Sequence, residues 1–135
     1  MIYKKLLEFQ KLGISVKKSS TNPHFKSKYA DLNEVLDKVS KPLNDLGVVI
    51  IQAHTMIGGK PGLRTTLIDT EDETYVVGFL PYVQTENAQK MGANIIYNRR
   101  YSLVTMLGLE DEDDDRNGAV SNAKNVPLAE DDLDL

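Results

Sequence analysis

Apolar residues near the start of the chain recur with the spacing of one face of a helix. Ile2, Leu6 and Phe9 lie at i, i+4 and i+7, which predicts a helix over residues 2–12. Gly13 follows this stretch, and glycine often ends a helix because it adopts the left-handed backbone conformation found there.

A second helical pattern runs from Asp31 to Leu46. Asp31 and Glu34 have the spacing of a reciprocal capping box. Pro42 is expected to kink this helix or end it early, because proline lacks the N–H donor and crowds the preceding turn. Gly47 is expected to cap its end. The apolar positions form one stripe along the helix: Leu32, Val35, Leu36, Val39, Leu43 and Leu46.

The middle of the chain changes to short apolar runs that are rich in β-branched residues. These runs predict three strands, at residues 48–55, 63–69 and 75–80. The connections between them are short and polar, and the first contains the sequence GGKPG (58–62), which is expected to form a hairpin turn. Short polar connections of this kind predict an antiparallel meander.

The longest apolar run lies in a last helix, predicted from near Thr85 to about Leu107. Gly108 stands where a left-handed cap belongs, and Leu109 is placed to pack back on the helix. The predicted order is α-α-β-β-β-α. It describes an α+β fold in which a long C-terminal helix packs on a three-stranded antiparallel sheet.

Charge divides the chain into two parts. Residues 1–109 hold 14 Lys and Arg against 10 Asp and Glu, a net charge of +4, whereas residues 110–135 hold 2 against 10, a net charge of −8. We therefore expect one folded domain over 1–109 and an acidic, disordered tail over 110–135. A basic body fits a polyanionic partner, but many domains of similar charge bind none.

Composition and motifs disfavour several classes of function. The chain has no cysteine, which excludes disulfides and thiolate metal sites, and no long apolar run, so we expect a cytosolic protein that does not span a membrane. The run starting at Asp113 resembles a calcium loop, but Lys124 stands where the loop needs a glutamate. No phosphate loop, catalytic triad or zinc spacing is recognisable, so we predict neither an enzyme nor a cofactor.

The last helix carries the only adjacent arginines, Arg99 and Arg100. Arg99 lies inside the apolar arc and Arg100 lies at its edge. A guanidinium on an apolar face must be paired, so Arg99 is expected to meet a carboxylate, a subunit interface or a phosphate. A structural ion pair and a phosphate contact therefore remain as alternatives. The polar face of the helix is predicted to hold Asn94, Asn98, Tyr101, Ser102 and Thr105.

A second group of candidate residues lies in the long polar connection at 14–30. Lys26 and Lys28 alternate there with Phe25 and Tyr29, and Lys17 and Lys18 precede them. Lysines that follow a phosphate backbone, together with aromatic rings that stack on bases, are what a single-strand groove needs. The alternative is a solvated loop anchored by two aromatic side chains.

Two stretches together form a recognisable pattern. Residues 22–52 read NPHFKSKYADLNEVLDKVSKPLNDLGVVIIQ, with Lys-Tyr-Ala-Asp-Leu at 28–32, and residues 89–115 read QKMGANIIYNRRYSLVTMLGLEDEDDD. The pattern resembles the Essential Recombination Function (Erf) family of phage single-strand DNA annealing proteins. The chain departs from the family at Ile96, where threonine is usual, and at Arg116, which interrupts the turn after the acidic run.

The resemblance implies a protein of phage homologous recombination. Such a protein binds single-stranded DNA, anneals complementary strands without ATP, and assembles into rings or helical filaments in the cytoplasm of a bacterial host. The DNA-binding residues would be Arg99, Arg100, Lys26, Lys28, Phe25, Tyr29, Lys17 and Lys18. Two alternatives remain: a protein that coats single-stranded DNA without annealing it, and a structural or regulatory phage protein that binds no DNA.

The acidic tail allows three interpretations. Its last residues, EDDLDL (130–135), mix acids with leucines and could dock on a host replication or repair protein. They could instead compete with DNA for a basic groove, or the tail could serve only solubility.

Overall fold

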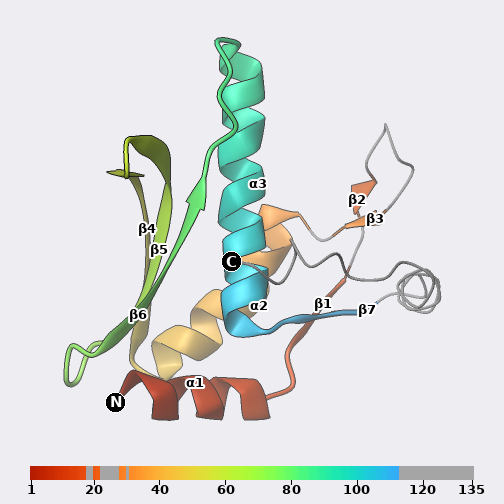
Figure 1. Ribbon diagram of the computed structural model, residues 1–135. Helices are drawn as coiled ribbons and strands as arrows, with labels where there is room; N and C mark the ends of the chain where they lie inside the picture. The colour runs from red at the N-terminus through yellow and green to blue at the C-terminus, as the bar shows by residue number, and fades with distance from the viewer. Residues whose placement is uncertain (18–19, 22–27, 30, 113–135) are drawn as a thin grey trace, which may run out of the picture.

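The structure is a computed structural model that describes residues 1–17, 20–21, 28–29 and 31–112 of the 135-residue chain. The six predicted helices and strands all form, in the predicted order, and the α+β class is confirmed (Figure 1). They are α1 (Ile2–Lys11), α2 (Leu32–Asp45), β4 (Val48–Ile57), β5 (Lys60–Asp69), β6 (Tyr75–Pro81) and α3 (Ala88–Leu107).

Four short strands were not predicted from the sequence. β2 (Ser20–Thr21) and β3 (Lys28–Tyr29) form an antiparallel pair within the long polar connection. β1 (Ser15–Lys17) pairs in parallel with β7 (Glu110–Glu112), which directly follows α3. The first residues of the acidic segment therefore take part in the fold.

The central sheet has the strand order β4-β5-β6 and is antiparallel throughout. Gly58 and Gly59 alone connect β4 to β5, and both have positive φ, +58° and +77°. A two-residue hairpin turn of type I′ needs positive φ at both central positions, and glycine reaches it without steric cost. The sequence GGKPG thus supplies the turn with its first two residues, while the rest of it belongs to β5.

Helices cover one face of this sheet, as Figure 1 shows for α2 and α3, while α1 lies across its lower end. Apolar side chains from all three helices and from the sheet form a single core: Ile2, Phe9, Val16, Leu32, Val35, Val39, Leu43, Val48, Leu67, Leu103 and Leu107. The other face of the sheet stays open. Ile51, Tyr75 and Val77 lie on it and are 45%, 61% and 53% exposed.

Helix α2 begins as predicted but ends later than Pro42 suggested. The Asp31 side chain accepts a hydrogen bond from the backbone N–H of Glu34 at 2.9 Å. Pro42 lies inside the helix, so an early end is not observed. Burial of Leu43, directly after the proline, outweighs the one backbone hydrogen bond that proline removes. Gly47 follows the helix with φ +85° and caps it, as predicted.

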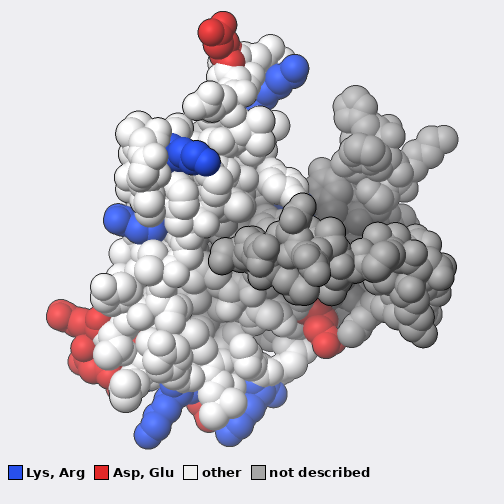
Figure 2. All heavy atoms as spheres, viewed as in Figure 1, with Lys and Arg blue, Asp and Glu red and all other residues white. Residues whose placement is uncertain are grey.

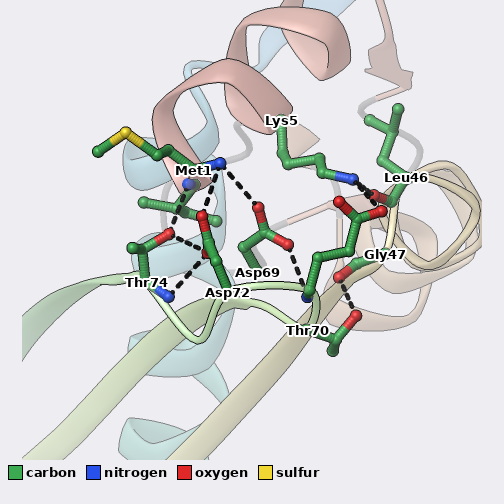
Figure 3. Close-up of polar contacts among 10 residues, drawn as sticks. Met1, Lys5, Leu46, Gly47, Asp69, Thr70, Asp72 and Thr74 are labelled. Carbon is green, nitrogen blue, oxygen red and sulfur yellow. Dashed lines mark hydrogen bonds and ion pairs between the residues drawn. The ribbon is translucent and has the colours of Figure 1, made fainter.

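A polar cluster fastens the start of α1 to the turn between β5 and β6 (Figure 3). The Met1 amino group lies 2.9 Å from Asp72 Oδ2 and 3.2 Å from Oδ2 of the fully buried Asp69. Thr74 Oγ1 accepts from the Ile2 N–H at 2.7 Å and donates to Asp72 Oδ1 at 2.6 Å. Hydrogen bonds from Thr74 and the amino group hold the pKa of Asp72 well below its ordinary value of 3.8.

The pH dependence of stability should report this cluster. Because folding lowers the pKa of Asp72, its contribution is present above about pH 4 and is lost as the pH falls. The hydrogen bond with Asp72 raises the pKa of the Met1 amino group above 8.0, so that contribution is present below pH 8 and is lost as the pH rises. We expect Asp72→Asn to lower Tm near neutral pH, with the difference from wild type shrinking at both extremes.

Thermal unfolding followed by circular dichroism across this pH range measures the effect. Glu86→Gln is the control, since it removes one exposed carboxylate outside the cluster. Equal Tm values for Asp72→Asn and wild type at every pH would show that the cluster contributes nothing.

Two glycines allow a second test of the packing. A Cβ at Gly62 would lie 2.6 Å from the Leu80 carbonyl oxygen and 2.6 Å from the Phe79 ring, whereas one at Gly92 in α3 would meet nothing within 4 Å. Gly62→Ala should therefore destabilise the protein by about 1–3 kcal/mol through overpacking. Gly92→Ala should stabilise it by about 0.5–1 kcal/mol because alanine favours the helix. The denaturant midpoints of the two variants measure both changes. A Gly62→Ala variant as stable as wild type would contradict the close contact of Gly62 with Leu80 and Phe79.

Candidate nucleic-acid interface

The face of α3 that packs on the sheet differs from the predicted one. Asn98 and Ser102, expected on the polar outer face, are only 2% and 9% exposed, whereas Ile96 is 54% exposed. The reason is local hydrogen bonding. Asn98 Nδ2 donates to the carbonyl oxygens of Pro81 at 3.1 Å and Leu80 at 3.3 Å, where β6 ends. The two carbonyls accept hydrogen bonds from a buried side chain, so an asparagine rather than an apolar residue fits this contact.

Arg99 is half-buried and is held by Gln52 of β4. Its Nε donates to Gln52 Oε1 at 3.0 Å, while Gln52 Nε2 donates to the Arg99 carbonyl oxygen at 3.1 Å and to Thr65 Oγ1 at 3.0 Å. Within the described part of the chain, no carboxylate forms an ion pair with Arg99. The partner of its side chain there is a neutral amide, so the positive charge itself is not neutralised.

Two further polar side chains lie near this pair. His54 Nδ1 and the Tyr82 hydroxyl are hydrogen-bonded at 2.5 Å. Burial raises the pKa of Tyr82, and the positive charge of Arg99 opposes this shift. On the side of β4 that faces the helices, the polar residues Gln52 and His54 thus follow the apolar residues of the core.

Arg100 occupies a different side of α3 from Arg99. Its guanidinium carbon lies 5.4 Å from the centre of the Tyr97 ring. Tyr97 and Tyr101 are stacked on each other, with centroids 5.6 Å apart and an interplanar angle of 17°. Both rings are almost half exposed, at 48% and 47%. This tyrosine–arginine cluster (Tyr97, Arg100 and Tyr101) combines exposed aromatic surface with the half-buried cation of Arg100.

The sequence analysis did not select Tyr97 or Tyr101 as binding residues. Their i, i+4 spacing, with Arg100 one position before Tyr101, was the available signal. The polarity of the residues does not reveal this surface, because a tyrosine is compatible with either the buried or the exposed face of a helix.

Of the other predicted binding residues, the structure describes only Lys17 and the backbone of Lys28 and Tyr29. Lys17 is exposed at the end of β1. Lys28 and Tyr29 form β3, of which only the backbone is described, and Figure 1 shows the β2–β3 pair on the side of α3 away from the central sheet. Three others lie outside the described residues: Lys18, Phe25 and Lys26.

Positive charge is spread rather than concentrated over the described part of one face of the molecule. Figure 2 shows one face of the molecule, on which the described Lys and Arg side chains stand apart from one another around a large uncharged area. A ligand on this face would meet uncharged surface more than dense positive charge. Among the described residues, no group of three His, Asp or Glu side chains is placed to hold a metal ion. None of the described helices has the length and apolarity that crossing a bilayer requires.

Comparison with known protein families shows to which family this chain belongs. A family model described as the ERF superfamily matches residues 2–130. The chain belongs to the ERF superfamily. The match covers both stretches on which the resemblance rested, and the family is one of phage recombination and single-strand DNA annealing proteins, which are generally not catalytic. No curated protein and no solved structure matches the chain.

Proposed function

We propose that this ERF protein binds single-stranded DNA and anneals complementary strands without ATP during phage homologous recombination. The proposal is carried by the tyrosine–arginine cluster on α3, considered together with membership in the family. Stacked, exposed aromatic rings can receive successive bases, because every base has a flat face. Annealing requires strands that are held while their pairing edges stay free, and stacking with phosphate contacts leaves those edges accessible.

The two arginines have different roles in this proposal. Arg100 lies over an exposed ring, so it can contact a phosphate while Tyr97 and Tyr101 stack on bases. Arg99 is fastened to Gln52 and reaches only a ligand that enters the groove beside β4. The path of the strand would continue over the remaining candidates: Lys17, Lys18, Phe25, Lys26, Lys28 and Tyr29.

Assembly with further copies of the chain is part of the proposal. The open face of the sheet, with Ile51, Tyr75 and Val77, is an apolar surface that a second copy could cover. It belongs to the sheet, whereas the tyrosine–arginine cluster belongs to α3, so association through the sheet would leave the cluster accessible. In a ring or filament, a small number of contacts per subunit is multiplied along one DNA strand.

The domain division follows from the same proposal. Residues 1–109 would bind DNA and other copies in the cytoplasm of a bacterial host. The acidic segment 110–135 would act separately, as a contact for a host replication or repair protein. Because Glu110–Glu112 form β7, a variant that removes the tail but no strand ends at Glu112.

Substitutions in the cluster provide the direct test. Tyr97→Ala and Tyr101→Ala should each weaken binding to a labelled oligo(dT), since one lost base stack is worth about 1–3 kcal/mol, roughly 5- to 150-fold. Arg100→Ala should lower affinity and reduce the slope of log K against log salt by about 0.7, the value for one phosphate contact on a single strand. Fluorescence anisotropy titrations at two or more salt concentrations measure both quantities.

Matched controls lie elsewhere on the surface. Tyr3→Ala removes a tyrosine that is 68% exposed on α1, and Lys4→Ala removes an exposed cation on the same helix. Neither should change affinity for DNA in the same titrations. Unchanged affinity and salt slope in folded Tyr97→Ala, Tyr101→Ala and Arg100→Ala variants would exclude the cluster as the DNA site.

An annealing assay separates the proposed function from its two alternatives. Complementary oligonucleotides with a fluorophore and a quencher should pair faster with protein and without nucleotide, and Tyr97→Ala should lose part of this acceleration. Tight binding without acceleration would indicate a protein that only coats single strands. Absence of binding would indicate a structural or regulatory protein.

A further inference from the structure

The outer edge of strand β4 is long, and no described strand pairs with it. β4 is the first strand in the order β4-β5-β6, and its ten residues include no Lys, Arg, Asp, Glu or Pro. Proteins usually protect such an edge with a charge, a proline or a bulge, because its free N–H and C=O groups can pair with another strand. Here the edge is available for pairing.

The hairpin register shows which backbone groups of β4 point outward. Ile57 and Lys60 flank the two-residue turn, so they form the hydrogen-bonded pair that closes the hairpin. Pairs alternate along an antiparallel ladder, so every second residue counted back from Met56 directs its backbone away from β5. These residues are Met56, His54, Gln52, Ile50 and Val48.

Among the described residues, a hydrogen-bond partner is found only for the beginning of this edge. Asn44 Nδ2 of α2 donates to the Val48 carbonyl oxygen at 3.0 Å. From Ile50 to Met56, no described residue forms a hydrogen bond with the outward backbone groups. The open length is therefore enough for a short strand of about six residues.

A groove of about 300 Å³ lies beside this open edge. Ser40 and Asn44 of α2 line one wall, Ile50 and Gln52 of β4 line the other, and Arg99 of α3 also lines it. Among the described residues, the Arg99 side chain makes one hydrogen bond, through Nε, and has no acidic partner. A strand added at the edge would point alternate side chains into this groove, where a carboxylate could pair with Arg99.

We infer that the segment Glu130–Leu135 of the same chain adds to the β4 edge as a fourth strand of the central sheet. The last four residues of its sequence, EDDLDL, alternate between acid and leucine, whereas Asp131 falls on the leucine side. In an extended conformation Asp132 and Asp134 lie on one face and Leu133 and Leu135 on the other. The acids would enter the groove with Arg99, and the leucines would lie beside Ile51 on the apolar open face.

Chemistry and length both favour this occupant. The free edge of β6 in a second copy carries Tyr75, Val77 and Phe79 and would bring no carboxylate to Arg99. The sequence between Glu112 and Glu130 can span up to about 60 Å when extended, which exceeds the diameter of a domain of this size. A tethered segment also binds at a high effective concentration. The inference concerns the edge of the sheet and does not depend on DNA binding.

Cross-linking in the full chain tests the placement, and the absence of native cysteines makes it specific. Ile51→Cys combined with Leu133→Cys places both thiols on the open face at the β4 edge. Val77→Cys combined with Leu133→Cys is the matched control, since Val77 lies on the same face but on β6 and is similarly exposed, at 53% against 45%. With a short bis-maleimide, the first pair should give several-fold more intramolecular product than the second.

Three results of this experiment would overturn the inference. They are equal yields from the two pairs, no product from either pair, and cross-linked dimers as the main product, which would place the segment on another copy. Adding Asp132→Asn and Asp134→Asn to the first pair should lower its yield to that of the control. An unchanged yield would overturn the pairing with Arg99.

Hydrogen exchange provides a second measurement without cysteines or linker. The outward amides of Ile50, Gln52, His54 and Met56 should exchange about tenfold more slowly in wild type than in the Asp132→Asn, Asp134→Asn variant, because the variant loses charge-assisted hydrogen bonds. Amides of the inner strand β5 should not differ between the two and report that both proteins are equally folded. Identical exchange along β4 would contradict the added strand.

Discussion

The packing of α3 on the sheet determines which side chains of this protein meet water. The contact is close because Gly78 leaves room for Met106, whose sulfur would lie 2.9 Å from a Cβ at that position. Leu103 and Leu107 fill the core on the same side, and Asn98 joins the helix to the end of β6 by two hydrogen bonds. Once these contacts are made, the rotation of the helix is set, and with it the direction of every other residue on α3.

This rotation separates two adjacent arginines into different environments. Successive residues of a helix point about 100° apart, so Arg99 faces the groove between α2 and β4 while Arg100 lies beside the exposed tyrosines. Gln52 holds Arg99 through its side-chain amide and leaves its charge available to an acidic group. A single Arg-Arg sequence can thus serve two ligands, a DNA backbone at one arginine and a carboxylate at the other.

The surface proposed for DNA lies on α3, whereas the surfaces proposed for a second copy and for the acidic segment both belong to the sheet and meet at Ile51. Single-stranded DNA would contact α3, a second copy would cover the open face of the sheet, and the acidic segment would extend the sheet at β4. An added strand at β4 would also remove an unprotected edge, which otherwise invites non-specific pairing between chains. At the β4 edge, the acidic segment would then both complete the sheet and prevent association between chains.

The local pattern of the sequence determined the helices, the strands and most of their ends. Spacing of apolar residues located α1, α2 and the three long strands, and short-range chemistry placed the Asp31 cap, the Gly58–Gly59 turn and the Gly108 cap, because these depend on neighbouring residues only. The tertiary structure decided the rest. Asn98 is buried because its amide donates to the carbonyl groups at the end of β6. Burial of Leu43 extends α2 past Pro42, and β7 pairs with β1 although the two strands lie far apart in the sequence. Such outcomes depend on partners distant in sequence, whose position no local pattern contains. For the same reason, the Tyr97–Arg100–Tyr101 cluster could be recognised only after the rotation of α3 was known.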